Sequence, residues 1–431
     1  MLRAWNQNPR IELLPMRTAL RSIGVVAACF CATSGFSQTA LTWQEVRDRF
    51  QNTNLALRAA QIGIEESKAQ EVTAYLRPNP DFSTSLDQLQ PFNADPYRPL
   101  GFALPLFSAN YLHERGHKRE LRLESAQKST GIAVAQLADE QRNLLFNLRN
   151  AFVQALQAKA ILAVAKENLA YYDRLLAVNQ DRLKAGDIAQ VDLDRLELQR
   201  VQYETDIQTS ETNVRTAKIQ LLQLMNDRTP VDQFDITGTF EFTEPGVTLD
   251  ELHQTALANR PDLQVAAAVV DKAKIDYKLA VANGTTDPTF GVDLGRNPPI
   301  PAYIGFSVNI PLRIFDKNQG EKTRTQLDIR KNERLQEAAR TQVFSDVDSA
   351  WTTLNSNGAL LRPYKNKYLQ LASKVRETVS YAYQHGGSSL LEFLNAQNDY
   401  RTVQLNYLNL VGSYMTAASQ LNLAVGREVM Q

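Results

Sequence analysis

Residues 393–424 read FLNAQNDYRTVQLNYLNLVGSYMTAASQLNLA, and the pattern in this segment is the strongest indication of the fold. Apolar and aromatic side chains recur in it at alternating spacings of three and four positions: Phe393, Ala396, Tyr400, Val403, Tyr407, Leu410, Tyr414, Ala417, Leu421 and Ala424. Such a heptad seam is typical of a helix that packs lengthwise against another helix in a coiled coil. The sequence therefore predicts a long packed helix over about 388–425.

A similar seam lies in the first half of the chain. Arg200 and Ser210 interrupt it, and its members are Leu193, Leu196, Tyr203, Ile207, Val214, Ala217, Leu221 and Leu224. A glycine turn precedes each seam, Ala185-Gly186-Asp187 in the first half and Gly386-Gly387-Ser388 in the second. Glycine allows the sharp reversal that a helical hairpin needs. The stretches before these turns contain almost no proline, a residue that breaks helices. We therefore expect long helices over about 110–184 and 316–384, each about 105 Å long.

The two hairpins belong to a tandem repeat. Thr42 and Glu45 recur as Thr248 and Glu251, 206 positions later, and each pair has the T-x-x-E spacing of a capping box. Further matches are Pro105 with Pro311 at the same offset and Gly186 with Gly386 at an offset of 200, which indicates a six-residue length difference between Pro105 and Gly186. We expect a first repeat over 38–226, a linker over 227–248 and a second repeat over 249–431.

Each repeat also carries alternating segments, over about 80–107 and about 288–311. Phe290, Val292 and Leu294, for example, alternate with smaller or polar residues, which predicts strands. Four strands are too few to close a membrane barrel, which needs at least about eight. The predicted fold is therefore mainly α with a small β part: two tandem repeats with long coiled-coil helices, plus four strands that join a β-barrel shared between copies.

The N-terminus has the features of an export signal. Arg17 and Arg21 precede the apolar run 23–32, and small residues follow it, so we expect residues 1–37 to be removed. Residues 1–15 form an upstream extension if Met16 is the true start. Lipidation of Cys29 is the alternative to cleavage near Gly35-Phe36-Ser37. Outside this segment the chain has no cysteine, which excludes disulfides and thiolate metal sites.

Composition excludes other classes. The 47 basic and 47 acidic residues balance, so nothing points to nucleic-acid binding.

One segment fits the H-E-x-x-H zinc-protease pattern: His113-Glu114-Arg115-Gly116-His117. Gly116 lies in its middle and no third ligand stands at a usable spacing, so we interpret the segment as a solvated turn. We expect no cofactor, no metal site and no enzymatic activity.

The chain resembles the TolC-type outer-membrane efflux proteins. Two stretches carry the resemblance: Asn259-Arg260-Pro261-Asp262-Leu263, and the pattern Pro363-x19-Tyr383-x2-Gly386-x5-Glu392-Phe393-Leu394-Asn395-Ala396-Gln397. Short loops are closer to the heavy-metal and cation efflux branch. The resemblance implies a homotrimer with a shared twelve-stranded β-barrel in outer-membrane lipid and a long coiled-coil helical barrel in the periplasm. It also implies a periplasmic adaptor and an inner-membrane efflux pump as partners.

The same resemblance suggests two sets of site residues. The hairpin tips would dock the adaptor through Arg182, Gly186, Asp187, Tyr383, Gly386 and Gly387. Acids one turn beyond the tips would form a ring at a periplasmic aperture, with Glu392 at the matching position, Asp192 as its first-half equivalent and Asn395 where a second acid can occur. The alternative for these acids is ordinary surface charge in the first turn of a helix.

Two other functions remain to be weighed against an efflux duct. A periplasmic adaptor is also an exported coiled-coil protein, but it would need a lipoyl-like β domain beside a single hairpin. A zinc hydrolase would need the H-E-x-x-H segment on a helix.

Overall fold

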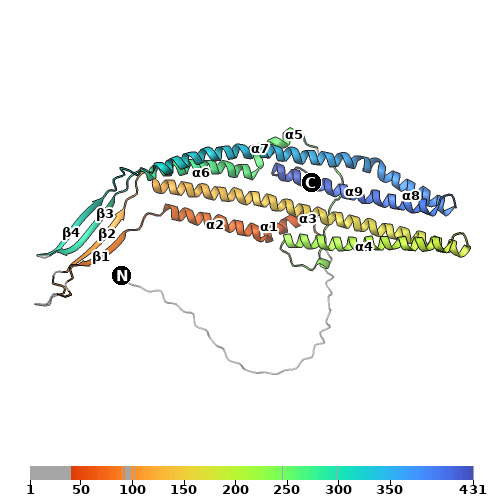
Figure 1. Cartoon of the computed structure of the whole chain (residues 1–431), viewed down its shortest axis with the longest axis horizontal. Coiled ribbons are helices and arrows are strands. Elements are labelled where there is room, and N and C mark those ends of the chain that lie inside the picture. Colours follow the sequence, from red (N-terminus) through yellow and green to blue (C-terminus); the bar gives the residue numbers. More distant parts are fainter. Residues whose placement is uncertain are drawn as a thin grey trace, which may run out of the picture. The chain divides into compact units, whose positions relative to one another are not determined.

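The computed structural model describes residues 40–89, 91–92, 99–101, 103–244, 246–297 and 299–430. The expected signal segment 1–37, with Cys29, lies outside the described residues. The described chain is built from long, nearly parallel helices that end on one side in a small sheet (Figure 1). None of the described helices is both long and apolar enough to cross a bilayer.

The first repeat begins with two short helices, α1 (Trp43–Thr53) and α2 (Leu55–Tyr75). Thr42 and Glu45 form the predicted capping box at the start of α1. Two strands follow, β1 (Asp81–Asp87) and β2 (Leu104–Leu112), and then the hairpin of α3 (Lys118–Ala185) and α4 (Gln190–Leu224). Helix α3 has 68 residues and is therefore about 100 Å long. It starts at Lys118 rather than the expected 110, because β2 continues to Leu112.

The second repeat has the same order of elements. Its bounds are α5 (Leu249–Asn259), α6 (Pro261–Asn283), β3 (Thr289–Asn297), β4 (Ile300–Asn309), α7 (Gln319–Pro363), α8 (Leu369–Gln384) and α9 (Leu390–Val425). Thr248 and Glu251 again form a capping box, so the tandem repeat is confirmed. The expected continuous helix over 316–384 was wrong: a π-turn, η2 (Tyr364–Tyr368), follows Pro363 and separates α7 from α8. Proline has no amide to donate and displaces the helical ladder.

One sequence match between the repeats was also wrong. Pro105 lies at the start of β2, opposite Leu86 of β1, whereas Pro311 follows the end of β4. The hairpin loop after β1 runs from 88 to 103, but β3 and β4 are separated only by residues 298–299. The length difference between the two repeats therefore lies in the loops that connect their strands. The two prolines are not equivalent, because Pro105 lies at the start of a strand and Pro311 lies after the end of one.

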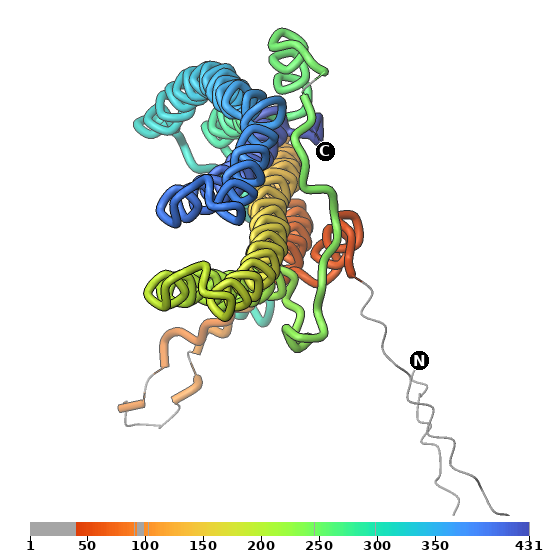
Figure 2. Tube along the Cα trace, turned by 90° about the vertical axis from the view of Figure 1, so that its right-hand side faces the viewer, coloured from red at the N-terminus to blue at the C-terminus, as the bar shows by residue number. Residues whose placement is uncertain are grey.

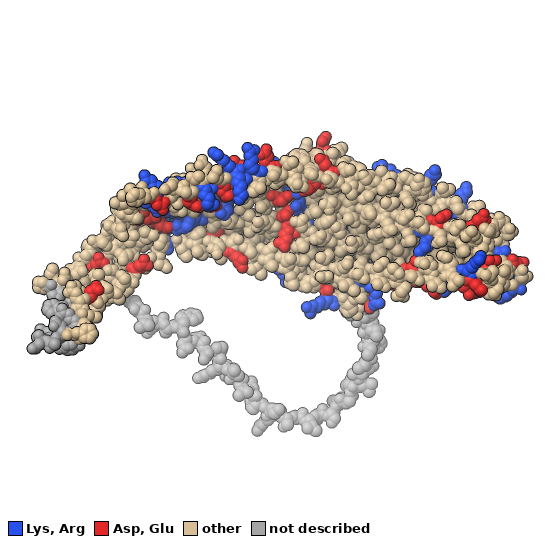
Figure 3. Space-filling model, viewed as in Figure 1, with Lys and Arg blue, Asp and Glu red and all other residues tan. Residues whose placement is uncertain are grey.

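The four strands form one antiparallel sheet in the order β1-β2-β3-β4. Strands β2 and β3 join the repeats, with Ala109 opposite Val292. One face exposes large apolar side chains: Phe82, Phe290, Val292, Leu294, Ile304, Phe306 and Val308. Figure 3 shows that few charged side chains cover the sheet. On the other face Ser108 donates to Asp293 at 2.6 Å. An outward apolar face with polar groups behind it is the pattern of a strand that faces lipid.

Helix α3 lies in the middle of the helical layer. It packs against α2 and α4 on one side and against α6 and α9 on the other, and α7 packs beyond α6 and α9. The linker that carries the short 3₁₀ helix η1 (Val231–Gln233) crosses this layer, and Phe234 and Ile236 enter one hydrophobic cluster while Phe242 enters another. A third cluster lies at the hairpin ends. The linker thus ties the two repeats together.

Candidate functional site

The reversal between α3 and α4 depends on Gly186. Its φ of 85° is left-handed, and its amide donates to the carbonyl of Leu183 at 3.0 Å. The Asp187 amide donates to the Arg182 carbonyl at 2.9 Å, which completes a glycine-terminated helix end. Gly186 and Asp187 are both exposed. The turn therefore presents backbone and one carboxylate at the end of the molecule farthest from the sheet (Figure 1).

The second reversal depends on one of its two glycines. Gly386 has a φ of 77°, whereas Gly387 does not have a positive φ. The Gly387 amide donates to the Ala382 carbonyl at 2.8 Å. Only Gly386 requires glycine's conformational freedom, because an L side chain in this region is strained.

Arg182 and Tyr383 connect the two turns. Arg182 Nη1 donates to the Tyr383 carbonyl at 3.3 Å, and the guanidinium lies 5.3 Å from the centre of the tyrosine ring. The Tyr383 ring stacks on Phe393 at 4.9 Å between centroids and is only 6% exposed. Burial raises the pKa of Tyr383. Among the expected tip residues Tyr383 is thus buried in the tip, so it positions the two hairpins and offers no surface for a partner.

The acid at the second tip completes a helix cap. Glu392 accepts hydrogen bonds from the Ser389 amide at 2.9 Å and the Ser388 hydroxyl at 2.7 Å. The hydrogen bond from Ser388, with those from Ser389, lowers the pKa of Glu392. Its side chain is exposed, and these hydrogen bonds favour the ionised carboxylate. Asp192 is half-buried in the first turn of α4, and Asn395 is exposed on α9.

Comparison with known proteins places this arrangement in a family. The family model for outer membrane efflux proteins matches residues 252–427. The cobalt-zinc-cadmium resistance protein CzcC of Cupriavidus metallidurans is 23% identical over 87% of each chain. The outer membrane efflux protein BepC of Brucella suis is 22% identical over 68% of this chain and 65% of its own.

Solved structures agree on the fold. CusC superposes with a TM-score of 0.74 at 17% identity, over 89% of this chain and 92% of its own. The open-state MtrE channel of Neisseria gonorrhoeae gives a TM-score of 0.71 at 16% identity, over 90% of this chain and 89% of its own. Residues 252–427 thus match the outer membrane efflux protein family, and the likeness to its members extends over most of the chain. The sheet is accordingly one part of a β-barrel in the outer membrane, and the helices lie in the periplasm.

The match to the outer membrane efflux protein family decides between the functions considered above. The chain is an efflux channel, and its relatives are channels rather than enzymes. The adaptor alternative has no support, since the described residues form one sheet and two hairpins without a separate β domain.

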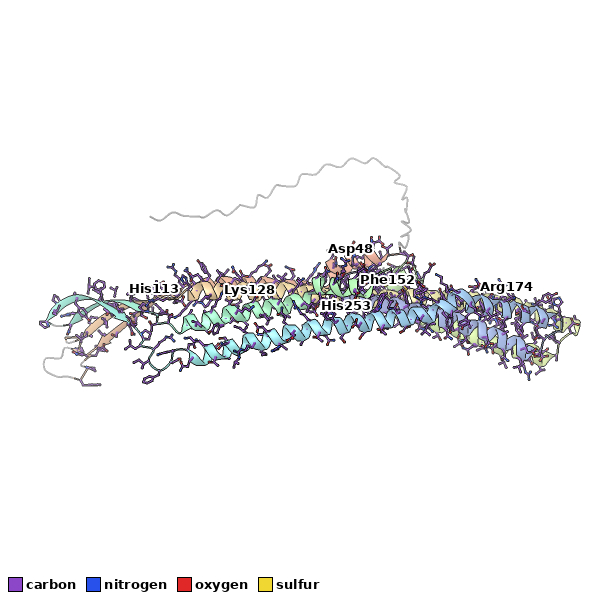
Figure 4. All side chains as sticks on the ribbon, turned by 90° about the horizontal axis from the view of Figure 1, so that it is seen from above. Asp48, His113, Lys128, Phe152, Arg174 and His253 are labelled. Carbon is purple, nitrogen blue, oxygen red and sulfur yellow. The ribbon has the colours of Figure 1, made fainter. Side chains whose placement is uncertain are left out.

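The H-E-x-x-H segment lies in a turn, not on a helix. His113 to Arg115 are irregular, Gly116 and His117 form a turn with positive φ, and helix α3 begins at Lys118. In an efflux channel this segment connects β2 to the helical part, and Figure 4 shows His113 there and His253 far from it. No group of three or more His, Cys, Asp or Glu in the described residues could hold a metal ion.

Sequence reasoning missed polar contacts that join neighbouring helices of this efflux channel, within a hairpin and between the two hairpins. Arg200, which interrupts the first seam, donates from Nε to Asp173 at 2.6 Å. Arg376 stacks over Tyr400 at 3.6 Å and over Tyr171 at 4.4 Å. The interruption of the seam at Arg200 was the only signal in the sequence, since the partners lie far apart along the chain.

Proposed function

We propose that three copies of this chain form a passive exit duct, which takes its cargo from a periplasmic adaptor and an inner-membrane pump. The open sheet carries this proposal. Strands β1 and β4 each pair on one side only, and the apolar face of the sheet is exposed. Open edges cannot face lipid, because unpaired backbone groups are too costly there. Three four-stranded sheets would supply twelve strands and leave no edge.

The tips support docking of an adaptor. Gly186, Asp187, Gly386 and Gly387 are exposed at the far end of the hairpins, and Arg182 is half-buried behind them. Tyr383 and its contact with Arg182 would hold the two tips at a fixed spacing. A partner would then meet backbone and small side chains, which allow close approach.

Metal cations are the cargo that we favour. CzcC is by name a cobalt-zinc-cadmium resistance protein, and the likeness covers 87% of both chains. Glu392 and Asp192, repeated three times around an axis, would place six carboxylates near the periplasmic aperture. Such a ring attracts cations and holds back anions. Organic cargo is the alternative, because OpmQ, a pyoverdine export protein of Pseudomonas aeruginosa, is 22% identical over 74% of this chain.

A disulfide between edge strands tests the trimer. Residues 40–430 contain no cysteine, so Ser85→Cys in β1 and Ser307→Cys in β4 would be the only thiols among them. Within one chain these strands are three spacings apart, about 14 Å, which is too far for a disulfide. Single cysteines are moved along β1 and β4 to find the register. Oxidation should yield a covalent trimer, and each single-cysteine variant serves as the control. If the cross-linked products are no larger than dimers, or if no pair of positions gives a cross-link, the shared barrel is refuted.

Cargo is tested in a bacterium that lacks its own channel of this kind and expresses the cognate pump and adaptor. Restored growth on cobalt, zinc or cadmium supports cation export. Restored growth on organic toxicants alone would assign the organic alternative.

A further inference from the structure

A cavity far from the tips and from the sheet is rich in arginine. It lies between α1, α3, the start of α6 and the end of α9, and its volume is about 480 Å³. Four of its lining residues are arginines: Arg47, Arg142, Arg149 and Arg427. Glu428 is the only acidic residue among the residues that line it in the described part of the chain. In Figure 4, Asp48 of α1 and Phe152 of α3 mark the neighbourhood of the cavity.

Arg149 is the least satisfied of these cations. It is half-buried on α3 with its guanidinium 4.5 Å from the centre of the Trp43 ring. No carboxylate in the described residues lies within 4 Å of it, and it makes no hydrogen bond there. Burial lowers the pKa of Arg149, and the charge of Glu428 opposes that shift. A partly desolvated cation without a paired anion is costly, and a contact with an aromatic ring recovers only part of that cost.

Glu428 shows that the cavity accepts a carboxylate. It accepts a hydrogen bond from Trp43 Nε1 at 3.0 Å, and its other oxygen lies 3.6 Å from Arg47 Nη1. The C-terminal segment that carries Glu428 is fixed, because the Asn422 side chain bonds the backbone of Val429 and Met430 at 2.7–2.9 Å. Arg47 also lies 3.6 Å from Asp48, and Arg142 is paired with Asp139 at 2.6 Å. Among the described residues, Arg149 and Arg427 are therefore the lining arginines without an ion pair, and they leave capacity for further negative charge.

The cavity also has a wall that suits an organic ligand. Trp43, Leu145 and Phe146 line it beside the arginines. Its volume falls within the range of about 300–1,000 Å³ that is usual for small-molecule sites. The Nε of Arg142 is buried without a hydrogen-bond partner, while its other nitrogens bind the Leu423 carbonyl and Asp139. An oxyanion would pair with Arg149, and the ring wall would contact the rest of the ligand.

The site lies inside one chain and away from its lateral edges. Helix α3 separates α2 and α4 from α6 and α9, and the cavity lies at the junction of α3, α6 and α9. In Figure 2, α1 and the linker lie on the right of α3, whereas the tip ends of α4 and α8 lie on its left. A neighbouring copy that pairs along the α2/α4 or α7/α8 edge would therefore leave the cavity open.

The second repeat does not duplicate the site. Leu249 and His253 occupy the positions 206 residues after Trp43 and Arg47. His253 is already bound to Asp348 at 2.7 Å. The second repeat therefore lacks the equivalents of the Trp43 ring and the Arg47 cation. The cavity is thus specific to the first repeat and does not follow from the repeated fold alone.

We propose that this cavity binds a small organic anion that carries carboxylate or phosphate groups, and that the ligand bridges Arg47, Arg149 and Arg427. Such a ligand would connect α1 and α3 of the first repeat to the C-terminal segment of the second. The proposal is independent of what the duct exports.

Calorimetric titration of the detergent-solubilised full-length assembly tests it at low ionic strength. Pyrophosphate and benzene-1,3-dicarboxylate are the two probes, and one saturable site per chain is expected for at least one of them. Binding of pyrophosphate alone assigns a phosphate ligand, and binding of the dicarboxylate alone assigns a carboxylate ligand. Arg149→Gln should weaken binding by at least about tenfold, because a charged hydrogen bond is lost.

Glu428→Gln should have the opposite effect. It removes the competing negative charge but keeps an oxygen that accepts from Trp43, so the same probe should bind more tightly. Arg334→Gln, an exposed arginine of α7 paired with Glu337, is the matched control and should bind as the wild type does. Arg427→Gln, at an exposed position, repeats the test if Arg149→Gln fails to assemble. Absence of saturable binding by both probes, or unchanged affinity in both arginine variants, would overturn the proposal.

Discussion

Arg401 of α9 binds Asp206 of α4 through two nitrogens. Nε lies 2.6 Å from Oδ2 and Nη2 lies 2.9 Å from Oδ1. Both side chains are only about one-fifth exposed, at 21% and 22%. This two-pronged contact joins the returning helix of one repeat to that of the other, within the part of the molecule that approaches the tips.

Loss of that contact should favour separation of the hairpins. Arg401→Gln removes a charged hydrogen-bond pair worth about 1.5–3 kcal/mol, which would shift an open-to-closed equilibrium by about 10- to 150-fold. Single-channel recordings in planar bilayers should show more time at high conductance. Arg324→Gln is the control, because Arg324 also binds Glu321 through two nitrogens but within α7 and in solvent. Equal conductance in both variants would contradict a closing role for Arg401.

The acids at the tips should make the channel cation-selective. Glu392→Gln is preferable to alanine, since glutamine still accepts from the Ser389 amide and preserves the cap. Combined with Asp192→Asn, it should weaken block by divalent cations and shift selectivity towards neutral. The effect should shrink as salt rises, because screening shortens the reach of the charges. Asn395→Asp should deepen the block if this exposed side chain faces the lumen. If the variant with both substitutions keeps the wild-type ion selectivity, these acids are ordinary surface charges at the ends of helices.

The two neighbouring glycines of the second tip should differ sharply. Gly386→Pro cannot adopt the φ of 77° and should abolish export while trimers still form, because the sheet lies about 100 Å away. Gly387→Ala should be tolerated, since an added Cβ would meet only ordinary contacts at 3.6 Å and 3.8 Å. Export assays and cross-linking to the adaptor measure both. Normal cross-linking by Gly386→Pro would count against docking at this tip.

Acid should weaken the contact between the start of α6 and α9 through Asp262, which binds Arg260, whose Nη1 donates to the Ala424 carbonyl of α9 at 3.2 Å. Burial alone would raise its pKa, but the hydrogen bond and charge of Arg260, with Arg142, lower it below the ordinary 3.8. Its stabilising effect is thus fully present above pH 3.8 and disappears as the pH falls through the lowered value. Asp262→Asn should lower the free energy of unfolding by about 1–2 kcal/mol at pH 7. It should also make the melting temperature depend less on pH in the acid range. Asp271→Asn on the same helix, more exposed and 3.7 Å from Lys128, should change neither.

The histidines of the H-E-x-x-H segment should be dispensable. His113→Ala with His117→Ala leaves the turn backbone, which depends on Gly116, and so should leave export intact. Elemental analysis of the purified protein provides a second readout. Stoichiometric zinc that disappears in the double variant would prove the turn interpretation wrong.

Local signals allowed much of the fold to be predicted. Both capping boxes, both glycine reversals and both seams involve residues a few positions apart, so their geometry follows from the helix itself. The four strands were also predictable, but the match of Pro105 with Pro311 failed. Strand pairing depends on partners distant in the chain, and a shared proline does not fix its register.

Periodicity and short-range spacing were enough to predict the repeat, the long hairpins, the four strands and the resemblance to an efflux family. Which polar side chains meet became clear from the three-dimensional packing alone. It buried Tyr383 inside the tip, paired Arg401 with Asp206, and gathered Arg47, Arg149 and Arg427 around one cavity. Those contacts join residues hundreds of positions apart. Their energies depend on burial and distance, which no local pattern records.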